Sequence, residues 1–193
     1  LSGVMHASAP VDLQQHDSYF VVAHFHYVIV GGILLGMFSG LYYWFPKVTG
    51  RRMNEMLGKT HFFFSFIFMN GVFGPMFLQG LAGVSRRLWD GGASYSHAQG
   101  VIEWNSFMSY SAFMLGLAQI PFIFNFFWSI WKGAKVGANP WQATTLEWVA
   151  ASSPPLGHGN FETPPVVYNG PYEYSVPGRD DDFLPQNVAV QEG

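Results

Sequence analysis

The sequence predicts an all-α, polytopic transmembrane helix bundle with an extended, proline-rich C-terminal tail. Charged residues make up 11 % of the 193 residues and aromatic residues 18 %, whereas soluble domains contain about 25 % charged residues. Three windows also lack Asp, Glu, Lys and Arg and are long enough for a helix to cross a bilayer core of about 30 Å. These windows are Ser18 to Pro46, Thr60 to Ser85 and Trp104 to Trp131.

Prolines and tryptophans define the expected helices further. Pro46 can end the first helix, because proline lacks a backbone donor. Pro75 and Pro121 lie inside the second and third windows, where transmembrane helices tolerate proline if neighbouring groups satisfy the freed carbonyl. Tryptophan rings near the window ends fit an aromatic belt. We expect membrane-spanning helices over about 18–46, 60–85 and 104–131.

The distribution of basic residues predicts the topology. Most of them follow the first and third windows, and such segments face the cytoplasm or its mitochondrial equivalent. They are Lys47, Arg51, Arg52, Lys59, Lys132 and Lys135. The outer side then holds residues 12–17 and the loop 86–103, so that Arg86 and Arg87 are exceptions to the positive-inside pattern.

The composition changes at about residue 152. Seven of the twelve prolines and the acidic run 180–182 lie beyond it, and such a segment lacks the apolar residues for a core of its own. We therefore expect a membrane part over 1–151 and an extended polar tail over 152–193 on the inner face. The net charge of −3 gives no reason to expect nucleic acid. The absence of cysteine excludes disulfides and cysteine-held metals, but leaves histidine-held metals open.

Two histidines lie in the uncharged run VVAHFHYVIV. Residues two apart on a helix point about 200° away from each other, so His24 and His26 cannot bind one metal together. Counted from His16 and Asp17 at the outer surface, they lie roughly 12 to 15 Å deep. Each buried histidine needs a partner. The partner is either a polar group on a neighbouring helix or a metal, and neutral imidazole is a good axial ligand for haem iron.

Two outer-side pairs extend the haem hypothesis. Arg86 and Arg87 can neutralise haem propionates through their guanidinium groups, or they are solvated loop charges or lipid contacts. His16 and Asp17 can bind a hard divalent cation. For Asp17, the helix N-cap is the alternative interpretation.

Five stretches resemble a known family. HDSYFVVAHFHYV, YYWFPKVTGRRMNE, GKTHFFF, FLQGLAGVSRR and NPWQATTLEW are similar to the C-terminal part of subunit I of the haem-copper terminal oxidases, of the cytochrome c oxidase type. The similarity runs from about Val11 to Pro155. It implies the last helices of a twelve-helix subunit I fold. It also implies a cytochrome c:oxygen oxidoreductase that reduces O₂ to water and translocates protons.

The resemblance implies roles for individual residues at two haems, expected to be of the A type. His24 would be the proximal ligand of the high-spin haem and His26 an axial ligand of the low-spin haem. Phe25 would lie between the two haems, as an electron-transfer group or as filler, and Asp12 near a propionate of the high-spin haem.

The resemblance also implies roles for the two outer-side pairs. Arg86 and Arg87 would hold the propionates, and His16 and Asp17 would bind magnesium at the interface with subunit II. The sequence departs from the family where Val84 and Ser85 replace Met-Pro, and where GPMFLQG lacks a histidine often found there.

Part of the family's catalytic centre is missing from this sequence. The ligands of the active-site copper come from earlier helices in the family, and the remaining histidines do not have the spacing to replace them. These are His6, His61, His97 and His158. We therefore expect that this chain requires the N-terminal part of subunit I and cannot reduce oxygen alone. The chain is either split or cleaved from that part, or the part is simply not included in this sequence.

The resemblance also implies partners and a location. The partners are subunit II with its copper centre, subunit III, cytochrome c and the lipid of a bacterial plasma membrane or mitochondrial inner membrane. A quinol oxidase of the same superfamily is an alternative, against which the Asp17 carboxylate argues because quinol-oxidising members tend to lack it. A non-catalytic structural or transport subunit with structural histidines is the other alternative.

Overall fold

The computed structural model describes residues 1–155, 161, 163–173, 177, 180 and 183–189. The chain forms two compact units, Leu1–Ser39 with Glu55–Phe124 and Gly40–Asn54 with Asn125–Gly193. Three helical segments of the described residues are long and apolar enough to cross a membrane: Tyr19–Thr49, Glu55–Leu81 and Ser96–Lys132. The prediction of an all-α, polytopic helix bundle is confirmed.

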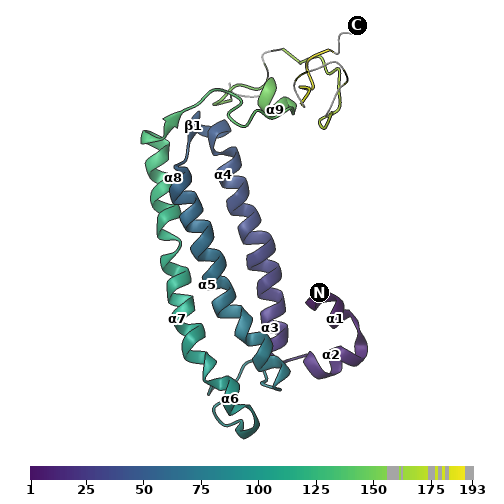
Figure 1. The fold of residues 1–193 in the computed structure, drawn as a ribbon, viewed down its shortest axis with the longest axis vertical. Coiled ribbons are helices and arrows are strands. Elements are labelled where there is room, and N and C mark those ends of the chain that lie inside the picture. The colour runs from purple at the N-terminus through teal and green to yellow at the C-terminus, as the bar shows by residue number, and fades with distance from the viewer. Residues whose placement is uncertain (156–160, 162, 174–176, 178–179, 181–182, 190–193) are drawn as a thin grey trace. The chain divides into compact units, whose positions relative to one another are not determined.

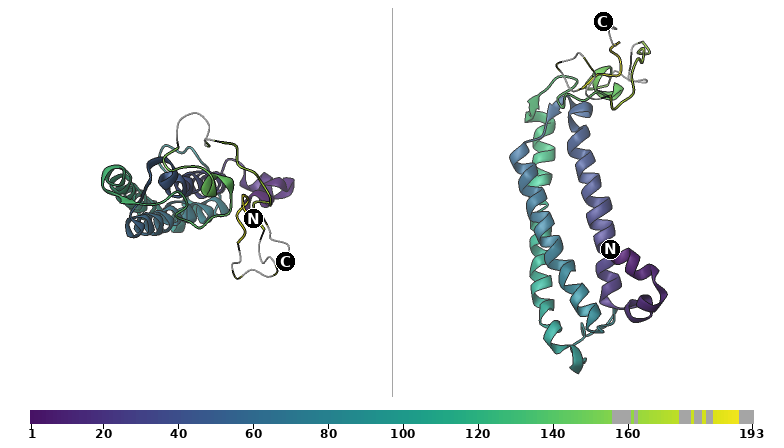
Figure 2. Two further views of the ribbon diagram at one scale, coloured as in Figure 1. Left: turned by 90° about the horizontal axis from the view of Figure 1, so that it is seen from above. Right: turned by 45° about the vertical axis from the view of Figure 1, so that its right-hand side comes forward.

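The first unit is built around one long central helix. Helix α5 (Glu55–Leu81) lies between α3 (Tyr19–His26) and α7 (Trp104–Leu117) and contacts both (Figure 1). Two short helices, α1 (Ser2–Ala7) and α2 (Ala9–Gln15), precede α3 and lie beside it (Figure 2, right). The remaining elements are the π-helix η1 (Tyr27–Leu34), the 3₁₀ helix η2 (Ser96–Ala98) and α6 (Gln99–Ile102).

Apolar packing and buried hydrogen bonds hold these helices together. Met69, Val72 and Phe73 of α5 form the centre of the core, against which Tyr27 packs. The Tyr27 hydroxyl donates to Oδ1 of Asn70 at 2.7 Å. A polar group inside a membrane protein needs such a partner because no water is available there.

The observed helix ends differ from the predicted ones. The first helix does not end at Pro46, because α4 (Leu35–Thr49) continues for three residues. The Thr49 hydroxyl donates to the Phe45 carbonyl at 2.8 Å, and Gly50 donates to the Pro46 carbonyl at 2.8 Å. Proline removes only its own donor, so the helix persists until Gly50, whose φ of +68° ends it.

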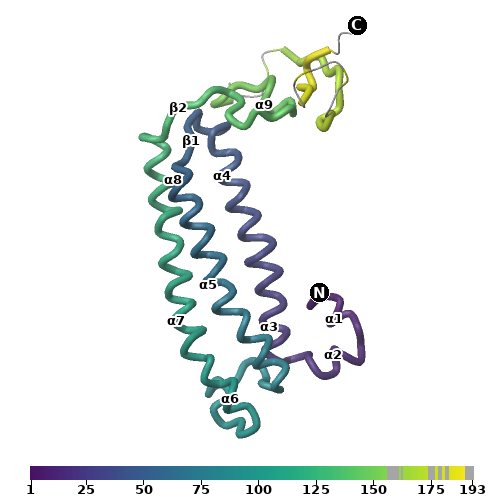
Figure 3. Tube along the Cα trace, viewed as in Figure 1, coloured from purple at the N-terminus to yellow at the C-terminus, as the bar shows by residue number. Residues whose placement is uncertain are grey.

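The second and third windows are also shifted or interrupted. Helix α5 begins at Glu55, whose carboxylate pairs with Lys59 at 2.8 Å. The predicted window began only at Thr60 because it excluded charged residues, and it therefore left out the first turn of the helix. The helix ends at Leu81, before Gly83 at φ +83°. Figure 3 shows the trace of α5 beside that of α7. The third window divides into α7 and α8 (Ile120–Lys132). Pro121 is the second residue of α8, where its missing donor costs no helical hydrogen bond.

The second unit contains the C-terminal part of α4 and a small sheet. Strand β1 (Arg51–Arg52) pairs antiparallel with β2 (Ala134–Lys135). Lys47 donates to the carbonyls of Ala138 at 3.2 Å and Ala151 at 2.9 Å, and lies 4.8 Å from the ring centre of Trp148 in α9 (Leu146–Val149). These contacts compensate the burial of the Lys47 ammonium group.

The division into a membrane part over 1–151 and a tail over 152–193 stays a prediction. In the second unit, Leu184 is buried, and the Gln186 backbone donates to the Thr144 carbonyl at 3.0 Å. The acidic residues 181–182 of the predicted tail lie outside the described residues.

Gly80 permits the closest approach of α3 and α5. A Cβ atom at Gly80 would overlap the backbone and Cβ of Phe20, which is itself 4 % exposed. The Phe20 ring also packs edge to face on Phe77, with ring centres 4.8 Å apart. The backbone of α3 therefore leaves no room for a side chain at this position of α5.

We predict that Gly80→Ala destabilises the assembled protein by about 1–3 kcal/mol, because the added methyl group has to displace backbone rather than a flexible side chain. Thermal denaturation of the purified membrane complex measures this as a lower Tm. Gly116→Ala is the matched control, since a Cβ atom there meets nothing within 4 Å. Equal Tm values for the two variants would contradict the close approach.

Candidate functional site

The start of α3 determines where its histidines lie. The Ser18 hydroxyl accepts a hydrogen bond from the Phe20 backbone at 3.2 Å and donates to the Gln15 carbonyl at 2.6 Å. Ser18 is therefore the N-cap of α3, and the interpretation of Asp17 as the N-cap is wrong. The reason is that the Asp17 carboxylate has a stronger, charged partner in Arg86.

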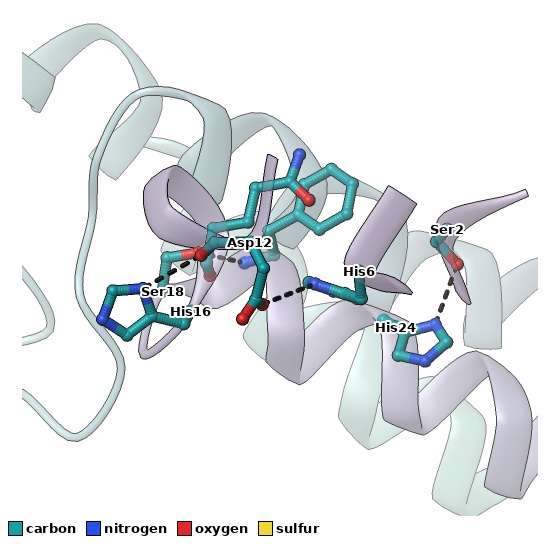
Figure 4. Close-up of polar contacts among 8 residues, drawn as sticks. Ser2, His6, Asp12, His16, Ser18 and His24 are labelled. Carbon is teal, nitrogen blue, oxygen red and sulfur yellow. Dashed lines mark hydrogen bonds and ion pairs between the residues drawn. The ribbon is translucent and has the colours of Figure 1, made fainter. Parts of the chain in front are cut away.

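His24 and His26 contact different parts of the first unit. The Nδ1 atom of His24 lies 2.9 Å from the Ser2 hydroxyl of α1 (Figure 4). The ring of His26 stacks on Phe73 of α5, with centres 4.3 Å apart and planes inclined by 11°. One histidine thus contacts the N-terminal helices and the other contacts the central helix. These contacts agree with the prediction that the two rings diverge.

His26 is also fixed within its own helix. Its Nδ1 donates to the Val22 carbonyl at 2.8 Å, because a carbonyl oxygen can only accept. Phe25 packs on the same ring, with centres 4.3 Å apart and planes inclined by 31°. Phe25 and Phe73 therefore both hold the His26 imidazole in one orientation.

The segment before α3 is joined to the loop after α5. Backbone hydrogen bonds run from Tyr19 to the Val84 carbonyl at 3.0 Å and from Arg86 to the Asp17 carbonyl at 2.9 Å. The Arg86 guanidinium adds contacts to Oδ1 of Asp17, 2.7 Å from Nε and 2.5 Å from Nη2. One residue from each of the two predicted outer-side pairs, Asp17 and Arg86, is thus brought into contact although the two are far apart in sequence.

The other members of these pairs lie differently. His16 is exposed, and its Nδ1 donates to the Asp12 carbonyl at 2.9 Å. Arg87 is exposed, with a left-handed φ of +64°. Within the part of the chain that the structure describes, no three His, Asp or Glu side chains are grouped to hold a metal ion. A magnesium ion at His16 and Asp17 would therefore need ligands from outside this set.

The departures from the family pattern have local structural roles. Val84 is completely buried, and the Ser85 hydroxyl accepts from the Tyr95 hydroxyl at 3.3 Å. In the stretch GPMFLQG, Gln79 is completely buried and donates to the Val101 carbonyl at 3.0 Å and to Oδ1 of Asn105 at 2.8 Å. This part of α5 is therefore held to α6 and α7.

The remaining histidines have separate environments. His61 is 2 % exposed and lies 3.0 Å from Oε1 of Gln119. His97 is exposed and stacks on Tyr95, while His158 lies outside the described residues. His6 of α1 lies beside His24, with ring centres 5.0 Å apart (Figure 4). The sequence pattern did not indicate the proximity of His6, because it depends on how α1 folds back onto α3.

Residues 1–115 match the family model described as "Cytochrome C and Quinol oxidase polypeptide I". The chain belongs to this family. The prediction from the motif HDSYFVVAHFHYV is confirmed, and the match includes all eight predicted site residues. They are Asp12, His16, Asp17, His24, Phe25, His26, Arg86 and Arg87.

Relatives named as oxidase subunits match nearly the whole chain. "Cytochrome c oxidase subunit 1" of Synechocystis is 45 % identical over 99 % of this chain and 33 % of its own length. "Alternative cytochrome c oxidase subunit 1" of Bradyrhizobium diazoefficiens is 43 % identical over 100 % of this chain and 33 % of its own. "Cytochrome c oxidase subunit 1" of Thermostichus vulcanus is 46 % identical over 94 % and 31 %. The chain thus spans about a third of the length of these relatives.

Family membership implies haem and copper as cofactors, and the two histidines of α3 fit haem. Because Nδ1 of His26 carries the proton, the lone pair of the neutral ring is on Nε2, the form that binds iron. The Ser2 hydroxyl can accept from Nδ1 of His24 and select the same tautomer. Both rings therefore have a fixed orientation and a nitrogen suited to a metal.

We predict a pH response for the Asp17–Arg86 pair. The hydrogen bond and the charge of Arg86 lower the pKa of Asp17 below its ordinary value of 3.8. The pair therefore contributes fully to stability above pH 3.8, and this contribution is lost as the pH falls through the lowered pKa. Infrared difference spectra, wild type minus Asp17→Asn, follow the protonated carboxyl band.

The variant Arg86→Gln should move this titration up towards 3.8, because both main causes of the shift are removed. Asp90 is the matched control: the Ser94 hydroxyl and the backbone of Gly92 and Ser94 lower its pKa without Arg86. An Asp17 titration that is the same in wild type and Arg86→Gln would contradict the ion pair.

Proposed function

We propose that this chain is the C-terminal part of subunit I of a cytochrome c oxidase and supplies one axial histidine to each of two haems. The observation that carries the proposal is the divergence of His24 and His26, each with a fixed ring, on one turn of α3. The names of the relatives support the oxidase type. When bound, the haem irons carry electrons and react with oxygen.

Each of the two histidines is proposed to bind a different haem. His24 is the proposed proximal ligand of the high-spin haem, and His26 the proposed axial ligand of the low-spin haem. Both haems are proposed to be of the A type. Each imidazole would hold its haem through Nε2, while the partner of Nδ1 keeps the ring from rotating. Phe25, which packs on His26, is proposed to lie between the two haems.

The outer side is proposed to hold the polar groups of the haems and a magnesium ion. Arg87, with Arg86, would pair with propionates, and Asp12 would lie near a propionate of the high-spin haem. Both Arg86 contacts are to Oδ1 of Asp17, which leaves Oδ2 as the oxygen proposed for magnesium together with His16. Arg86 would then connect the propionates to the metal.

The complete reaction requires other polypeptides. We propose that the N-terminal part of subunit I supplies the copper ligands, and that subunit II, with its copper centre, receives electrons from cytochrome c. Subunit III completes the assembly. Oxygen is reduced to water with coupled proton translocation. The protein lies in a bacterial plasma membrane or mitochondrial inner membrane, with the segment 152–193 on the inner side.

A quinol oxidase is the second candidate, because the description of the matching family includes both types. Oxygen consumption by the purified complex distinguishes them. Rapid turnover with reduced cytochrome c, and little with quinol, is expected for the first proposal. The reverse would favour the second candidate. Two haem spectra in the purified complex would exclude the non-catalytic subunit considered from the sequence.

We predict that replacing each histidine affects a different haem. His26→Ala removes the low-spin haem from the optical spectrum, because no other ring of α3 takes its place. His24→Ala abolishes or shifts the carbon monoxide difference spectrum of the high-spin haem. The measurement is the reduced and the reduced, carbon monoxide-treated spectrum of the whole complex.

His97→Ala is the control variant, since His97 is exposed in the outer loop and stacks on Tyr95. It should leave both spectra unchanged. Survival of both haem signals in both α3 variants would refute the assignment of the axial ligands.

A further inference from the structure

His6 of α1 lies beside His24 and contacts residues of both α2 and α3. Its Nδ1 lies 3.5 Å from Oδ1 of Asp12 in α2, and its ring lies 5.0 Å from that of His24 in α3 (Figure 4). On the other side the ring packs edge to face on Phe20, with centres 5.3 Å apart. His6 is therefore enclosed by an acid, an aromatic ring and the proposed haem ligand.

The burial of His6 makes these contacts significant. Its side chain is 15 % exposed, and Nε2 is buried without a hydrogen-bond partner among the described residues. Buried polar atoms almost always have a partner. An apolar side chain would fill the space between Phe20 and His24 without that cost, so packing alone does not account for an imidazole here.

The distance to Asp12 defines what His6 can do. A separation of 3.5 Å is long for a hydrogen bond, but short enough for the ring N–H dipole to act on the carboxylate. With Nδ1–H directed at Asp12, the lone pair of a neutral ring is on Nε2. In this form His6 weakens the negative field of Asp12 and presents its ring to His24.

We propose that His6 is a positioning residue of the high-spin haem site, acting through Asp12 and through the ring of His24. The inference rests on the proposed function, in which His24 binds that haem and Asp12 lies near its propionate. The His6 ring limits rotation of the His24 imidazole, and its N–H reduces the field that Asp12 exerts on the haem. A residue on α1 thus adjusts a centre whose ligand is on α3.

Two measurements on the assembled oxidase separate these two effects. The iron–histidine stretching band of the reduced high-spin haem, recorded by resonance Raman spectroscopy, reports the orientation of His24. The midpoint potential of the same haem, recorded by spectroelectrochemistry, reports the field of Asp12. The low-spin haem is the internal reference, because His26 is held by Val22 and Phe73 and not by His6.

Three variants of His6 give different results. His6→Ala loses ring and donor, so the band shifts or broadens and the potential falls, because an uncompensated negative charge favours the oxidised iron. His6→Phe keeps the ring, so the potential falls while the band stays unchanged. His6→Asn keeps a donor near the position of Nδ1, so the potential returns towards the wild-type value. His97→Ala, in an exposed loop, is the control.

Wild-type values of band and potential in both His6→Ala and His6→Phe would overturn this inference alone. If His6→Ala fails to assemble, the comparison of His6→Phe with His6→Asn still tests the role of the N–H donor. Equal midpoint potentials of the high-spin haem in these two variants would overturn that role. Absence of the two haems from the wild-type complex would instead overturn the proposed function, before any variant is compared.

Discussion

The backbone contact between the start of α3 and the end of α5 is the constraint on which the site depends. Gly80 lets the two helices approach until the backbone of Phe20 occupies the place of a side chain. Two backbone hydrogen bonds, from Tyr19 to Val84 and from Arg86 to Asp17, then join the segments that flank them. Because a helix is rigid, fixing its first turn also fixes the direction of every side chain that follows.

The same contact brings the charges of Asp17 and Arg86 together. Asp17 and Arg86 are separated in sequence by two helical segments long enough to span a membrane, and they meet because their backbones are already paired. The charges add specificity to this pairing, since a bound carboxylate orients the guanidinium group. A metal ion here would meet the Asp17 carboxylate, and a propionate would meet the Arg86 guanidinium group, both already held in position.

The fold class could be predicted from the sequence because a bilayer restricts the secondary structures that can cross it. Long uncharged windows have few alternatives to helices, and the three predicted windows all correspond to helical segments. The helix ends were not predictable from charge alone, because Lys47 and Glu55 lie within helices. The Lys47 ammonium group donates to the Ala151 carbonyl, and the Glu55 carboxylate pairs with Lys59. The divergence of His24 and His26 followed from helical geometry, which involves a single element.

Contacts between elements were less accessible to sequence reasoning. For Asp17, a helix N-cap was one of the two interpretations of the sequence, but Ser18 is the N-cap and the Asp17 carboxylate pairs with Arg86. The position of His6 was not predictable for the same reason, since the turns between α1, α2 and α3 determine that it lies beside Asp12 and His24. Such contacts depend on the packing of short helices, which carries no periodic pattern in the sequence.

This difference in origin distinguishes the two proposed haem sites. His26 donates a hydrogen bond to a carbonyl of its own helix, so its orientation is kept as long as α3 remains helical. His24 contacts Ser2 and His6, both from α1, so its orientation depends on how α1 packs against α3. Under the proposed assignment, the low-spin haem would therefore have a ligand held within α3, and the high-spin haem a ligand held by tertiary contacts from α1.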